Sequence, residues 1–131
     1  MMNLKYNKQL IKFLVFLHIL FFISWIGLFF VPESIWPNRV FYHFWYVIGV
    51  MGLNVGWGSS IKLYNKRGNL FVCPLTTMTQ YARGHKISDE KNNGHSFVSE
   101  ILLNLNIRYP RLIILMGGTL SVLIISYQYF L

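Results

Sequence analysis

The chain has 131 residues, of which 54% are apolar, and it carries twelve Lys or Arg against four Asp or Glu. A soluble domain of this length cannot bury so much apolar surface, so the composition favours lipid as the surrounding solvent. No basic stripe of the kind found on a soluble nucleic-acid-binding face is present, which excludes nucleic acid as the expected partner. Membrane topology and attraction to anionic lipid headgroups explain the basic excess.

Three stretches contain no Asp, Glu, Lys or Arg, and they run Phe13–Val31, Val40–Ile61 and Leu112–Leu131. At about 1.5 Å per residue, each helix reaches the roughly 30 Å of a hydrocarbon core. A helix is the form in which one isolated segment satisfies its own backbone there. The sequence therefore predicts an all-α integral membrane protein. Residues 1–131 form one membrane domain, with spans at about 10–31, 39–61 and 111–131.

The basic residues predict the orientation of these spans. Three lysines precede the first span, and the connector 32–39 holds Arg39, which Glu33 balances. The other eight basic residues lie between residues 62 and 111. Eleven of the twelve are then on one side, which the positive-inside rule makes cytoplasmic. We expect a cell inner or plasma membrane protein with a cytoplasmic N-terminus, a cytoplasmic segment at 62–110 and an outer C-terminus. No small-residue cleavage site follows the first span, so it is expected to be an uncleaved anchor.

Small residues recur on one face of the second and third spans. Gly49, Gly52 and Gly56 are spaced by three and four residues, and Gly117 and Ser121 repeat the four-residue spacing. Such faces let helices approach closely in lipid. We expect the two faces to meet each other, or one of them to meet another subunit or a second copy of the chain.

The cytoplasmic segment holds the only cysteine, in the run Cys73-Pro74-Leu75-Thr76. A residue before proline avoids the helical region, so this run predicts the start of a surface helix, with Thr76 or Thr77 as its cap. Apolar residues at helical spacing over 97–105 predict a second short helix, lying in the membrane interface.

His18 lies deep in the first span, where a titratable group is a candidate for haem ligation or proton transfer. A second haem ligand would have to be His43, yet the two histidines differ in depth by more than about 10 Å. The expected role of His18 is a neutral side chain that bonds to a neighbouring helix. The sequence identifies no cofactor.

Cys73 is the candidate nucleophile. A helix start after Pro74 would favour its thiolate, with Arg83 or His85 as further help. The spacing of Cys73, His85 and His95 matches no zinc pattern, so no metal site is expected. The alternative is that Cys73 is a small packing residue without chemistry.

Several short motifs together resemble a small bacterial membrane-protein family of unknown function that carries a Cys-Pro-Leu-Thr signature. In chain order these motifs are Leu17-His18-Ile19-Leu20-Phe21, Gly56-Trp57, Cys73-Pro74-Leu75-Thr76, Tyr81-x-Arg83, Gly94, Phe97-Val98 and Tyr109-Pro110. The resemblance implies the same membrane topology and supplies no reaction. The chain departs from the family pattern in three ways: fifteen residues separate Trp57 from Cys73, Thr79 replaces a glutamate, and Ser99-Glu100 replaces a Glu-His pair.

Three functions are compatible with these observations. The first is a small accessory or assembly subunit that packs its glycine faces against a larger membrane complex. The second is a membrane-embedded enzyme, or a protein that binds lipid, quinone or haem, with its site near Cys73. The third is a pore-forming protein of the holin type.

Overall fold

The computed structural model describes residues 8–66, 68–87, 97–108 and 111–131, and these ranges contain helices and no strands. Five helices follow in chain order: α1 (Lys8–Gly27), α2 (Arg39–Asn65), α3 (Pro74–Ala82), α5 (Phe97–Asn104) and α6 (Arg111–Phe130). The two expected short helices are therefore present as α3 and α5. The predicted Tyr109-Pro110 boundary lies outside the described residues.

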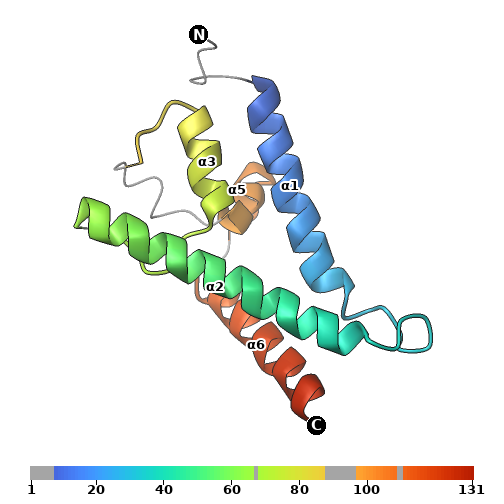
Figure 1. Ribbon diagram of the computed structural model, residues 1–131. Coiled ribbons are helices and arrows are strands. Elements are labelled where there is room, and N and C mark those ends of the chain that lie inside the picture. The colour runs from blue at the N-terminus through green and yellow to red at the C-terminus, as the bar shows by residue number, and fades with distance from the viewer. Residues whose placement is uncertain (1–7, 67, 88–96, 109–110) are drawn as a thin grey trace.

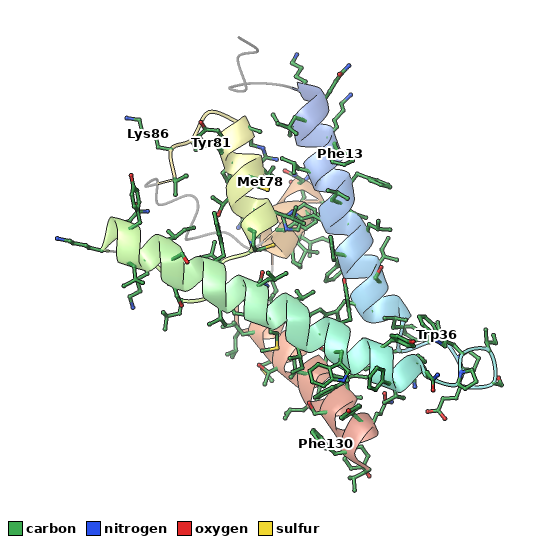
Figure 2. The ribbon with its side chains drawn as sticks, viewed as in Figure 1. Phe13, Trp36, Met78, Tyr81, Lys86 and Phe130 are labelled. Atoms are coloured by element: carbon green, nitrogen blue, oxygen red, sulfur yellow. The ribbon has the colours of Figure 1, made fainter. Side chains whose placement is uncertain are left out.

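Two of the long helices, α1 and α6, are long and apolar enough to cross a membrane. Both leave most of their side chains exposed, unlike the core helix of a soluble protein. Phe13 on α1 and Phe130 on α6, both labelled in Figure 2, illustrate this, since they are 56% and 74% exposed. These exposed apolar surfaces favour a membrane as the surroundings of the two helices.

The third expected span corresponds to α2, which falls short of the apolarity that α1 and α6 reach. Its composition gives the reason, because glycines, serines and Asn54 dilute its apolar residues. The predicted spans also differ in their ends. The first helix stops at Gly27 rather than near residue 31, and the second continues to Asn65, where Lys66 adopts a left-handed conformation.

The helices are arranged as two groups. α3 packs beside α1, and α6 packs beside α2. α2 runs obliquely to α1 and α3 (Figure 1). A small apolar cluster joins α2 to α6 through Phe44, Val47 and Ile125. The indole Nε1 of Trp25 on α1 donates to Ser121 Oγ on α6 at 3.1 Å, so α1 also contacts α6.

Polar side chains of α2 bind the C-terminal part of α1. Arg39 donates to the carbonyl oxygen of Leu28 at 2.9 Å, and the hydroxyl of Tyr46 donates to the carbonyl oxygen of Phe21 at 2.8 Å. Between them, His43 Nε2 lies 2.9 Å from the carbonyl oxygen of Trp25. Trp25 lies in the last turn of α1, where carbonyl groups lack partners within the helix, so His43 is placed to bind one of them.

Candidate functional site

The candidate site is a cysteine–histidine pair formed across 55 positions of sequence. Nε2 of His18 lies 3.2 Å from Sγ of Cys73. His18 is only 7% exposed, whereas the thiol-bearing Cys73 is half-buried. Both residues are candidates from the sequence, in two unrelated roles. The fold places them in direct contact.

The start of α3 fixes the position of Cys73. Cys73 is the N-cap residue, with an extended backbone, and Pro74 occupies the first helical turn. This arrangement follows from the proline, which favours an extended residue before it and is tolerated where no helical N–H is needed. The predicted cap at Thr76 or Thr77 is wrong. Both residues lie inside the helix, and their backbone N–H groups donate to the carbonyl of Cys73.

A close contact with α2 holds the segment before Cys73. The backbone N–H of Val72 donates to the carbonyl oxygen of Asn54 at 3.2 Å. At Gly58 the chain passes so near to α2 that an added Cβ would overlap the carbonyl of Leu70 and lie 2.9 Å from the nitrogen of Phe71. The absence of a side chain at Gly58 therefore allows this segment, and with it the cysteine, to reach α1.

The helix α3 buries its polar face and exposes apolar side chains. Its buried residues are Thr76, Thr77, Thr79, Gln80 and Ala82. Met78 and Tyr81, by contrast, are about half exposed, and they are labelled in Figure 2. The polar side chains of α3 therefore pack against the rest of the chain, and its apolar side chains face outward.

Hydrogen-bonding and aromatic groups surround the pair. Oγ1 of Thr76 lies 3.5 Å from His18 Nε2, and Trp57 of α2 donates from Nε1 to Thr77 Oγ1 at 3.0 Å. Phe97, the first residue of α5, stacks on the imidazole with a centroid separation of 4.1 Å and an interplanar angle of 10°. Residues from four helices therefore hold His18 and the residues that follow Cys73.

This geometry suits nucleophilic chemistry. An imidazole within hydrogen-bond reach of a thiol can accept its proton, and a third group that orients the base completes the usual signature. Phe97 stacks on the imidazole of His18 and fixes the plane of its ring.

The other predicted ligands lie elsewhere. His43 contacts the carbonyl of Trp25, seven residues or about 10 Å further along α1 than His18. Arg83 and His85 lie at the end of α3 opposite to Cys73, and His95 falls outside the described residues. In the described part of the chain, no three His, Cys, Asp or Glu side chains gather as metal ligands do.

The predicted glycine faces do not meet within the chain. A Cβ added at Gly49, Gly52, Gly56 or Gly117 would find nothing within 4 Å. Ser121 does make a contact between helices, through the indole of Trp25. The glycine face of α2 therefore borders open space, where lipid or another molecule can lie.

Two polar features of this apolar sequence could have indicated that His18 and Cys73 lie close together. His18 is a titratable group inside a span, and the run from Thr76 to Gln80 is a polar helix face, so each requires a polar partner away from lipid. No protein-family model, curated protein or solved structure matches the chain.

Proposed function

We propose that the chain is a membrane-embedded protein whose function resides in a nucleophilic thiol, Cys73, with His18 as its base. The observation that carries this proposal is the 3.2 Å contact between His18 Nε2 and Cys73 Sγ. Cys73 is half-buried rather than enclosed, unlike His18. In addition, four of the residues that carry the resemblance, namely His18, Trp57, Cys73 and Thr76, lie at this site.

The proposed membrane arrangement has three crossings, with α2 as the third. Its 27 residues extend about 40 Å, which exceeds the thickness of a hydrocarbon core. Its buried stripe includes the polar residues Arg39, His43 and Asn54, while aromatic residues such as Trp45 are exposed. That distribution suits a helix surrounded by lipid. The basic residues favour a cytoplasmic N-terminus, which places α3 and Cys73 on the cytoplasmic side.

Alkylation of Cys73 tests the proposed thiol site. The purified chain in lipid vesicles is treated with N-ethylmaleimide at neutral pH, and the modification is followed by intact mass. We expect His18→Asn to slow the reaction about tenfold or more, because the loss of a general base typically costs 10²–10⁴-fold. His85→Asn, which removes an imidazole at the other end of α3, is the matched control. Equal rates in the three proteins would refute the proposal.

A second candidate function is an accessory subunit that binds another transmembrane helix. The unfilled space over Gly49, Gly52 and Gly56 favours it, because such a face allows close helix packing. Extraction in mild detergent, followed by native electrophoresis and mass spectrometry, would reveal a stoichiometric partner. Under this function Gly52→Leu releases the partner. If the chain migrates alone, this candidate is eliminated.

A further inference from the structure

A shallow groove on α2 ends at Pro74, the residue that directly follows Cys73. It has a volume of about 380 Å³, within the range of small-molecule sites. Three glycines form its floor and larger residues border it: Gly49, Gly52, Leu53, Gly56, Trp57, Ser60 and Pro74. The lining is mainly apolar, and the hydroxyl of Ser60 donates to the carbonyl of Gly56 at 2.8 Å, so the groove suits a hydrocarbon chain.

The depth of the pair agrees with a lipid-borne substrate. His18 lies six residues after Lys12, the last basic residue before the apolar stretch of α1. With α1 as a membrane crossing, the pair lies about 9 Å further into the bilayer than the backbone of Lys12. Lysine side chains extend outward toward the headgroups, so this level is the outer part of the acyl-chain region.

From these observations we infer that Cys73 accepts a fatty acyl group from an acyl thioester, while the acyl chain lies in the groove over Gly52. The inference rests on the proposed thiol site and adds its substrate class. A glycine floor leaves room for a chain against the backbone of α2, where any larger side chain would occupy the space. A thioester matches a thiol nucleophile because the exchange requires no oxidant or reductant.

The reaction is a balanced exchange of thioesters. Nε2 of His18 accepts the proton of the Cys73 thiol, and the sulfur attacks the carbonyl carbon of the donor. The bond between this carbon and the donor sulfur then breaks. His18 returns the proton to the donor sulfur, which leaves as a free thiol. Cys73 retains the acyl group as a thioester, and His18 is neutral again.

The test uses the full chain in phosphatidylcholine–phosphatidylglycerol vesicles with palmitoyl-coenzyme A. We expect intact mass to show one added palmitoyl group that hydroxylamine removes and that Cys73→Ser lacks. His18→Gln should slow its formation about tenfold or more. Gly52→Leu, which fills the groove, should slow it similarly. The control is Gly118→Leu on α6, where an added Cβ also meets nothing within 4 Å, and it should react at the original rate.

Each other outcome overturns a defined part of the inference. If no palmitoyl group is added while maleimide alkylation still depends on His18, the substrate class is wrong and the thiol site stands. If neither reaction depends on His18, the proposed function fails as well. If Gly52→Leu acylates at the original rate but loses a co-purifying protein, the groove binds a partner helix and the assignment to an acyl chain is wrong. Gly52→Leu leaves the hydrogen bonds of the pair intact, so it stays informative even where a His18 variant folds poorly.

Discussion

Replacing Gly58 by alanine tests whether the close passage of the chain over α2 positions the thiol. The added Cβ meets backbone atoms of Leu70 and Phe71, which cannot rotate away as a side chain would. Overpacking of this kind costs about 2 kcal/mol, and the displaced segment also loses the Val72–Asn54 hydrogen bond, about 1 kcal/mol. The better helix propensity of alanine returns about 1 kcal/mol. The expected net loss of unfolding free energy is about 2 kcal/mol.

Gly56→Ala, two residues away on the same helix, is the matched control for Gly58→Ala. Its Cβ meets nothing within 4 Å, so it should gain the propensity term of about 1 kcal/mol. Unfolding by a titration with dodecyl sulfate in mixed micelles should therefore separate the two variants by about 3 kcal/mol. In Gly58→Ala the maleimide reaction of Cys73 should also lose its dependence on His18. If Gly58→Ala is as stable as Gly56→Ala, the close contact is not a constraint on the fold.

Two further experiments examine hydrogen bonds that join the helices, and both use the same unfolding titration. Trp57→Phe leaves the buried hydroxyl of Thr77 without its indole donor and should lower the free energy of unfolding by about 1–2 kcal/mol. The control is Trp36→Phe, at an exposed position, which should change the free energy of unfolding by less than about 0.5 kcal/mol. A double-mutant cycle of Trp25→Phe and Ser121→Ala should give a coupling free energy of about 0.6 kcal/mol, the average for hydrogen bonds between helices in membranes. If the effects of the two substitutions are additive, this 3.1 Å hydrogen bond does not hold α1 to α6.

The long helices could be predicted from the sequence because each depends on a local property. Charge-free runs of about twenty residues identify α1, α2 and α6, and the apolar period over 97–105 identifies α5. Pro74 likewise locates the start of α3, because the constraint of proline acts on the next and previous residues alone. The cap at Cys73 was missed because the threonines are the better capping residues by type.

The site depends on contacts between residues far apart in the sequence. Whether Cys73 touches His18 is decided by where the chain passes over α2, which in turn requires glycine at position 58. The spacing of residues within one segment does not predict where the chain passes over α2. For the same reason the glycine spacing alone leaves open whether the two faces meet each other or one of them meets a partner, whereas the fold directs the face of α2 outward. A pattern on one helix indicates that a partner is possible and does not identify the partner.

The polar interior gives a physical reason why the chemistry lies where it does. Between helices in lipid, apolar side chains gain little by leaving one apolar surrounding for another, so hydrogen bonds and close packing decide which helices associate. The buried polar residues of α1 and α3 can therefore hold these helices together as well as form a site. His18 serves both purposes, since the contact that would activate Cys73 also joins α1 to the start of α3. A His18 variant should consequently affect stability and thiol reactivity together. Gly52→Leu, by contrast, fills the groove at a position where an added Cβ meets nothing within 4 Å, so it is the variant that tests the groove without removing a contact of the pair.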